Sequence, residues 1–204
     1  MLKNKSSIVS ALKYAAPYIR LFKNKIFVIK VGGELFTDKV LTRKLIEQIA
    51  ILQQLGIRII LIHGGGIQST QMASSLGIEA QFVEGRRITD AKSIEIATMI
   101  LNGKINTQIL AVAREFDLNA IGMSGIDAGL INAHRREALK TKDNKLIDYG
   151  FVGDIDSINT DLLEKQLNAN LIPVISPLTC DKNGVILNIN ADTVAASIAA
   201  AIGA

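Results

Sequence analysis

Short runs of Ile, Val and Leu alternate along the chain with longer stretches in which apolar residues recur every three or four positions. The short runs predict buried strands at residues 26–29, 57–62, 120–123 and 171–175. The longer stretches predict helices at 41–55, in the segment that ends at Leu76, and at 91–116. Because Ile- and Val-rich strands alternate with helices, we expect an α/β fold, a three-layer α-β-α sandwich with a mainly parallel sheet.

The first 24 residues have a different pattern, and we treat them as an extension in front of one domain over residues 25–204. Apolar residues at helical spacing predict an amphipathic helix with a kink or break at Pro17: Ile8, Leu12, Ala15, Ile19 and Phe22. We expect its apolar face to pack on this chain or on a second subunit. A membrane surface or a transit peptide is less favoured, because the stripe is narrow and lacks Trp.

Composition and charge narrow the class of protein. The chain has 204 residues, 49% hydrophobic, a net charge of +4 and one cysteine, which suits a globular domain without an internal disulfide. Aromatic residues make up only 4%, and beyond the first stretch basic residues are mixed with acidic ones, so nucleic-acid binding is not expected. No segment of the domain reads as a membrane span and none as a secretion signal, so we expect a cytoplasmic protein.

Two glycine clusters follow the first two predicted strands: Lys30-Val31-Gly32-Gly33 and His63-Gly64-Gly65-Gly66. Ligands collect at the carboxyl ends of parallel strands, where glycine N–H groups and a helix N-terminus suit an anion. Ordinary tight turns are the alternative explanation, which the paired placement and the lysine weaken. We therefore predict a phosphate-type site.

The sequence lacks the residue patterns of several other classes of site. Neither the P-loop pattern nor G-x-G-x-x-G after a strand occurs, and the region of Ser124 has no G-x-S-x-G spacing. The two histidines, His63 and His134, do not make a transition-metal site. We expect His63 to be a partly buried turn residue and not a catalyst. A polar stretch over 132–148 predicts a hairpin or excursion at the surface.

Two further groups suit a small anion. Arg86 and Arg87 follow a glycine, and guanidinium groups bind carboxylates through two hydrogen bonds. Asn188 and Asn190 share one strand face, so one of them is available to a ligand, while Asn190 or Asp192 could cap the following helix. The residues by themselves thus predict an α/β protein that binds a small anion carrying phosphate or carboxylate.

Six segments, in order and in register, resemble the motifs of the amino-acid kinase family over residues from about Tyr18 to the end: Val28-Ile29-Lys30-Val31-Gly32-Gly33, Ile62-His63-Gly64-Gly65-Gly66, Gly85-Arg86-Arg87-Ile88-Thr89-Asp90, Gly122-Met123-Ser124-Gly125-Ile126-Asp127, Tyr149-Gly150-Phe151-Val152-Gly153-Asp154 and Asn188-Ile189-Asn190-Ala191-Asp192. The resemblance is strongest to the members that phosphorylate the side-chain carboxylate of N-acetyl-L-glutamate in arginine biosynthesis. It implies the fold of the family's N-terminal lobe, ATP as phosphoryl donor, and magnesium carried by the nucleotide.

The resemblance also implies roles for eight residues. Lys30 would neutralise charge on the transferred phosphoryl group, and Asp192 would hold Lys30 in place. The binding residues would be Gly32, Gly33, Gly64 and Gly65 for the phosphoryl group and the acceptor, and Arg87 and Asn188 for the amino-acid end of the acceptor. No general base is needed, because a carboxylate is already ionised at neutral pH.

In this family a nucleotide-binding lobe follows the Asn-x-Asn-Ala-Asp segment, and the 204 residues do not include it. We therefore expect the chain alone not to phosphorylate at a normal rate. Two alternatives stay open: the regulatory kinase-like domain of an acetylglutamate synthase, and a non-catalytic module that binds an acidic amino acid. An aminoadipate-type substrate also stays open. The resemblance further implies a homo-oligomer, a dimer or a ring of dimers joined through the N-terminal helix.

Overall fold

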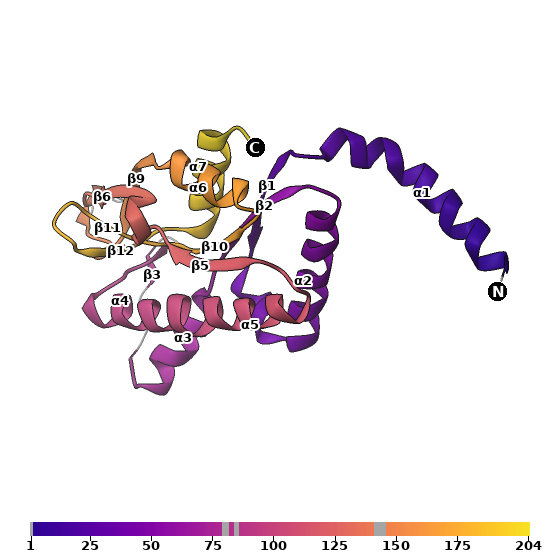
Figure 1. Ribbon diagram of the computed structural model, residues 1–204. Coiled ribbons are helices and arrows are strands. Elements are labelled where there is room, and N and C mark those ends of the chain that lie inside the picture. Colours follow the sequence, from indigo (N-terminus) through magenta and orange to yellow (C-terminus); the bar gives the residue numbers. More distant parts are fainter. Residues whose placement is uncertain (1, 79–81, 84–85, 141–145) are drawn as a thin grey trace.

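The centre of the molecule is a parallel sheet of four strands with helices on both faces (Figure 1). The computed structural model describes residues 2–78, 82–83, 86–140 and 146–204. The strands stand in the order β1-β2-β10-β5, with bounds β1 (Ile26–Val31), β2 (Arg58–His63), β10 (Ile172–Ser176) and β5 (Ala120–Ser124). This architecture confirms the predicted three-layer α/β fold.

Strand β2 shows why the sheet needs two covering layers. Its side chains alternate between two separate cores, Ile59 and Leu61 in one and Ile60 and Ile62 in the other, and each is at most 1% exposed. Successive side chains of a strand point to opposite faces, so a continuous apolar run can be satisfied only when both faces are covered.

Helices from different parts of the chain form the two outer layers. One layer consists of α2 (Lys39–Gln54), α3 (Gly66–Ser75), α4 (Ala91–Thr98), the π-helix η2 (Met99–Asn106) and α5 (Thr107–Glu115). The opposite face of the sheet is covered by α6 (Thr160–Asn168) and α7 (Ala191–Ile202). The helix predicted for 91–116 is thus a continuous run of α4, η2 and α5, with a π-helical middle that the spacing of apolar residues did not indicate.

A second, mixed sheet lies beyond the ends of the parallel strands, in the order β12-β11-β6-β9. Its members are β6 (Ile131–Arg135), β9 (Gly153–Ile158), β11 (Leu178–Cys180) and β12 (Ile186–Asn188). The stretch 132–148, predicted as a surface excursion, supplies most of β6 and the short hairpin β7 (Leu139–Lys140) and β8 (Leu146–Ile147); residues 141–145 lie outside the described part. The remaining short elements are η1 (Gly33–Thr37), β3 (Phe82–Val83), β4 (Arg86–Arg87) and η3 (Asp127–Gly129).

The N-terminal helix α1 (Leu2–Phe22) projects away from this body (Figure 1). It continues through Pro17, so of the predicted kink or break at that residue the break is not found. Of the apolar side chains that were expected to be covered, Ile8 and Leu12 are 57% and 58% exposed, whereas Ala15 and Ile19 are half-buried and Phe22 packs edge-on against Phe27, with ring centroids 5.6 Å apart. Packing on its own chain, one of the two expected arrangements, is therefore found at Phe22, at the end of the helix, and the side chains of Ile8 and Leu12 stay open.

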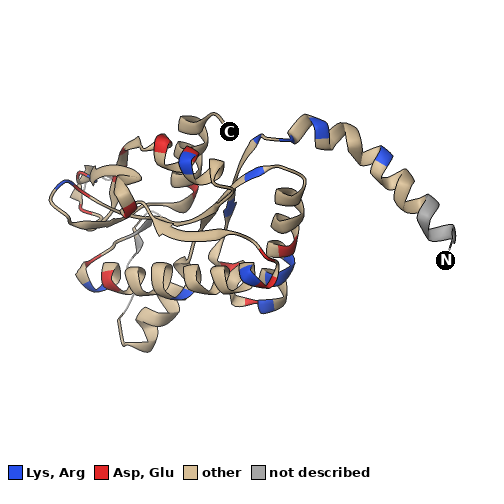
Figure 2. Ribbon diagram, viewed as in Figure 1, with Lys and Arg blue, Asp and Glu red and all other residues tan. Residues whose placement is uncertain are grey.

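Charge follows the same division between helix and body. Basic and acidic side chains are interspersed over the body, whereas the part of α1 that is coloured by charge carries only basic ones (Figure 2). Within the described residues, none of the helices has both the length and the apolar character needed to cross a membrane.

Candidate functional site

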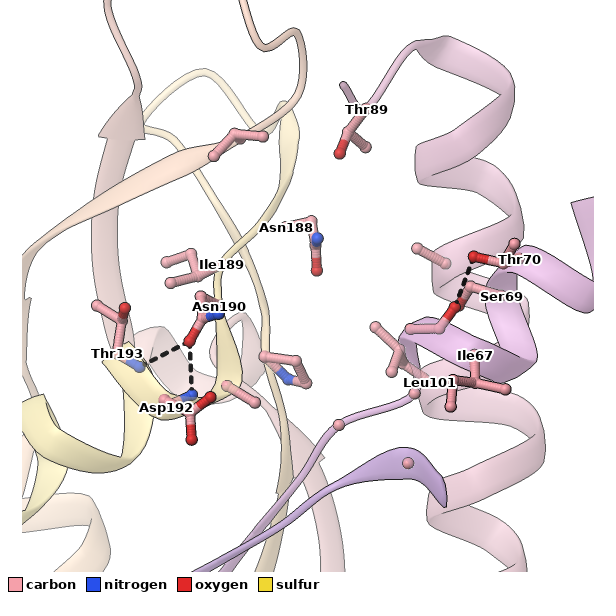
Figure 3. Close-up of a pocket in the computed structure, with 18 of the residues that line it drawn as sticks. Ile67, Ser69, Thr70, Thr89, Leu101, Asn188, Ile189, Asn190, Asp192 and Thr193 are labelled. Atoms are coloured by element: carbon pink, nitrogen blue, oxygen red, sulfur yellow. Dashed lines mark hydrogen bonds between the residues drawn. The ribbon is translucent and has the colours of Figure 1, made fainter. Parts of the chain in front are cut away.

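A cleft of about 950 Å³ opens where β1 and β2 end (Figure 3). One wall is made by the two glycine turns and the start of α3, and the other by β12 and the start of α7. The carboxyl ends of parallel strands thus meet the N-termini of two helices, as the order of motifs predicts. This is the arrangement in which an α/β protein binds an anion.

Lys30 and Asp192 meet at the base of this cleft. Lys30 is the next-to-last residue of β1 and Asp192 lies in the first turn of α7, and their Nζ and Oδ1 atoms are 2.9 Å apart. The two side chains are 30% and 68% exposed, so the ion pair adds little to stability in water. Its consequence is positional, because it fixes the ammonium group beside the glycine turns.

The two predicted glycine turns pack directly against each other. A Cβ atom built on Gly33 would lie 2.8 Å from the Gly65 Cα atom, and one on Gly65 would lie 2.4 Å from Ile105 Cδ1. In contrast, a Cβ atom on Gly32 or Gly66 would meet nothing within 4 Å. Packing therefore requires glycine at positions 33 and 65 and leaves open space beside Gly32 and Gly66.

Some N–H groups of the glycine turns are already hydrogen-bonded within the protein and others are not, a difference that the spacing of residues in the sequence does not reveal. The Gly64 N–H already donates to the Val31 carbonyl at 2.9 Å, so it would have to share that bond with a ligand. Among the described residues, the Gly32 and Gly65 N–H groups have no hydrogen-bond partner. Gly65 is the N-cap of α3 and has no side chain with which to cap it, so the first-turn N–H groups also stay available.

The two asparagines near the end of the chain have different tasks. The Asn190 side chain accepts hydrogen bonds from the N–H groups of Asp192 and Thr193, at 2.8 and 3.1 Å, and caps α7. The Asn188 side chain instead points into the cleft (Figure 3), while its N–H donates to the Phe151 carbonyl at 2.9 Å. Of the two, Asn188 is thus the one left for a ligand.

Arg87, the predicted carboxylate-binding residue, lies on the short strand β4. Its main chain pairs with Phe82 in the two-stranded β3-β4 ribbon, and its side chain lies outside the described part of the structure. The predicted carboxylate contact of Arg87 therefore stays a prediction.

Sequence reasoning missed a further part of the cleft lining, here called the far wall, which includes Thr89, Ser93 and Arg136. The Arg136 guanidinium makes a two-pronged contact with Asp154, its Nη2 atom 2.5 Å from Oδ1 and its Nε atom 3.1 Å from both carboxylate oxygens. The hydrogen bonds that Arg136 donates to Asp154 raise the pKa of Arg136, against the opposing effect of burial. The signal lay in the segment 149–154, which was noted as a motif without a role for its acidic residue.

His63 is more deeply buried than expected. It is 0% exposed, not partly buried, and burial lowers its pKa to about 4, against the opposing effect of its contact with the Gly64 carbonyl. The ring Nε2 atom is 3.2 Å from Asn106 Nδ2, and the same Asn106 amide donates to the Val174 carbonyl at 2.9 Å. A neutral His63 thus lies beneath the glycine turn and does not line the cleft.

No group of three or more His, Cys, Asp or Glu side chains that could hold a metal ion occurs in the ranges that the structure describes. Asp192 is the one acidic residue among the described side chains that line the cleft, and it is paired with Lys30. These donors do not make a metal site of their own.

Comparison with known proteins extends these observations. The model of the amino acid kinase family matches residues 25–204. The chain is 41% identical to acetylglutamate kinase of Myxococcus xanthus (strain DK1622), covering 96% of this chain and 65% of the relative, and 43% identical to acetylglutamate kinase of Methanocorpusculum labreanum, covering 96% and 67%. It thus spans about two thirds of the length of these relatives.

A solved structure of N-acetylglutamate synthase from Neisseria gonorrhoeae, complexed with coenzyme A and N-acetyl-glutamate, is also similar, with a TM-score of 0.81 and 27% identity. That similarity covers 96% of this chain and 43% of the synthase.

Proposed function

Because the chain belongs to the amino acid kinase family, we propose that it is the acceptor-binding lobe of a kinase that phosphorylates the side-chain carboxylate of N-acetyl-L-glutamate. In this reaction a carboxylate oxygen forms a bond to the γ-phosphorus of ATP as the bond from that phosphorus to ADP breaks. The acceptor is already ionised at neutral pH, so the protein has no proton to remove.

The observation that carries this proposal is the position of Lys30. Its ammonium group lies at the base of the cleft, held by Asp192 at 2.9 Å and flanked by both glycine turns. Phosphoryl transfer between two anions is catalysed mainly by positioning and by neutralising charge. Lys30 would supply the charge, and Asp192 would keep it in place.

The acceptor would extend from this point along the cleft. Free N–H groups of the turns, such as those of Gly32 and Gly65, would bind its side-chain carboxylate or the phosphoryl group. Asn188 on the opposite wall and Arg87 on the β4 strand would hold the amino-acid end of the acceptor. This direction places the charged reacting end beside Lys30.

ATP would supply the phosphoryl group, and the magnesium it carries would screen the phosphate charge. The described residues suit only the phosphoryl end of ATP, which Lys30, the glycine turns and the uncapped start of α3 would contact.

Calorimetric titration of the 204-residue chain with N-acetyl-L-glutamate tests this function. We expect binding that Asn188→Ala weakens at least about fivefold, because a ligand hydrogen bond is lost. Asn183→Ala is the matched control, since Asn183 is an exposed turn residue. No binding by a folded chain, or equal weakening by both substitutions, would contradict the proposal.

A regulatory domain is the second candidate, and the similarity to the synthase structure is the observation that favours it. Adding the family's nucleotide lobe in trans separates the two. A kinase would then form an acyl phosphate, which hydroxylamine traps, and Lys30→Met would abolish it. Tight binding without any acyl phosphate would indicate a sensor.

We also propose that α1 joins copies of the chain, because apolar side chains such as those of Ile8 and Leu12 are open to solvent. Removing residues 1–24 should then lower the number of chains per particle, which light scattering gives as the measured mass divided by the mass of one chain. An unchanged number of chains per particle would contradict this role.

A further inference from the structure

Thr89 is held rigidly on the far wall of the cleft, just before α4. Its N–H donates to the Tyr149 carbonyl at 2.9 Å, and its carbonyl accepts the Phe151 N–H at 2.7 Å. Gly150, between these two partners, has a φ of +75°, and a Cβ atom there would lie 2.2 Å from the Thr89 carbonyl oxygen. The close approach thus depends on glycine and fixes the Thr89 backbone.

The hydroxyl of Thr89 has no such partner. The residue is 2% exposed, and its Oγ1 atom is buried without a hydrogen bond to any described group. An unpaired buried hydroxyl is costly, and proteins rarely leave one unless something else binds to it. Thr89 lines the cleft and faces Asn188 across it (Figure 3), so a ligand in the cleft can supply the missing partner.

The surroundings of Thr89 indicate what kind of group that partner is. The lining here includes Ser93, which is 4% exposed, Arg136, which is paired with Asp154, and the apolar side chains of Ala97 and Val152. Among the described lining residues the acidic one, Asp192, is already paired with Lys30. The described lining residues therefore offer no free carboxylate to an ammonium group, whereas a neutral polar group with an apolar end finds both a hydroxyl and apolar contacts.

We propose that Thr89 is a specificity-determining residue whose Oγ1 hydroxyl hydrogen-bonds the acylated amino group of the substrate. Because the described lining residues hold no unpaired carboxylate, the site favours an N-acyl amino acid over one with a free amine. This assignment rests on the proposed function, because it takes an N-acylated acidic amino acid as the ligand of the cleft.

Two ligands and two variants test the assignment on the 204-residue chain. N-acetyl-L-glutamate carries the acylated amino group, and glutarate has the same two carboxylates without it. Thr89→Val keeps the shape and removes the hydroxyl, whereas Thr89→Ser keeps the hydroxyl. We expect Thr89→Val to weaken N-acetyl-L-glutamate about tenfold and glutarate less than about twofold, with Thr89→Ser within about threefold of wild type.

Thermal unfolding without ligand provides the second readout. Because no bond within the described protein is lost, the midpoint of Thr89→Val should equal or exceed that of wild type. A clearly lower midpoint, unchanged affinity for N-acetyl-L-glutamate, or equal weakening of both ligands would overturn the role of Thr89. If the folded wild type fails to bind N-acetyl-L-glutamate, the proposed function itself falls, and this assignment with it.

Discussion

The buried His63 makes the stability of this protein sensitive to mild acid. Burial lowers the pKa of His63 from 6.5 to about 4. Below pH 6.5 the unfolded chain therefore takes up a proton at this ring that the folded protein does not bind until about pH 4. The unfolded state gains protons first, so the free energy of unfolding falls as the pH drops through this window and is unaffected above it.

The size of the effect follows from the pKa difference. Since a tenfold difference in proton affinity is worth about 1.4 kcal/mol, the change from 6.5 to about 4 corresponds to about 3 kcal/mol lost at the acid end of the window. That is a large fraction of the roughly 5–15 kcal/mol by which a typical domain is stable.

Urea unfolding at a series of pH values measures this loss. His63→Gln removes the titrating group and keeps a donor and an acceptor for the Gly64 carbonyl and the Asn106 amide. The difference in unfolding free energy between wild type and variant should change by about 3 kcal/mol from neutral pH to about pH 4. Carboxylates are common to both proteins, so their titration cancels in the difference.

The second histidine, His134, offers the matched control, because its side chain is 56% exposed. His134→Gln keeps His63 and should keep the acid-dependent loss assigned to it. If wild type and His63→Gln lose stability in parallel over the whole window, the ring is protonated as readily when folded as when unfolded. The conclusion that His63 is neutral in the folded protein would then be wrong.

Two further substitutions test the packing around the cleft. Gly65→Ala should destabilise the protein by about 1–3 kcal/mol in urea denaturation, because its Cβ would come within 2.4 Å of Ile105 Cδ1 and 2.7 Å of Leu101 Cδ2. Gly66→Ala, with nothing within 4 Å, should change stability by less than about 0.5 kcal/mol, and equal losses at the two positions would refute the packing argument. Asn190→Ala should cost about 1 kcal/mol in the same assay through loss of the α7 cap, whereas Asn190→Asp, which keeps the acceptor, should not.

The parallel sheet was predictable because its strands are buried on both faces. The middle of such a strand, as in residues 59–62 of β2, must then be apolar throughout, and that signal does not depend on what packs against it. The second sheet gave no comparable signal. Its strands β11 and β12 have three residues each, too few for a periodic pattern, and they form because distant segments meet beside β6.

In the candidate site, too, some residues could be predicted from local sequence and others depend on contacts between distant segments. Lys30 lies near the end of β1 and the glycine turns directly follow β1 and β2, so their shared position could be inferred from parallel topology alone. Thr89 could not be found this way, because its position depends on the bridge to Gly150, far along the chain. The choice between Asn188 and Asn190 turned on where α7 begins, and the spacing of apolar residues locates a helix start only to within a few residues.

The glycine turns show how one sequence signal can serve two purposes. Gly33 and Gly65 are glycines because the two turns and the π-helix leave no room for a Cβ atom. Gly32 and Gly66 have that room, and their φ angles are not in the left-handed region, so the fold does not require glycine there. A side chain at either position would occupy the space from which a ligand reaches the main chain. The packing glycines thus shape the turns, and the other two leave the approach to their N–H groups open.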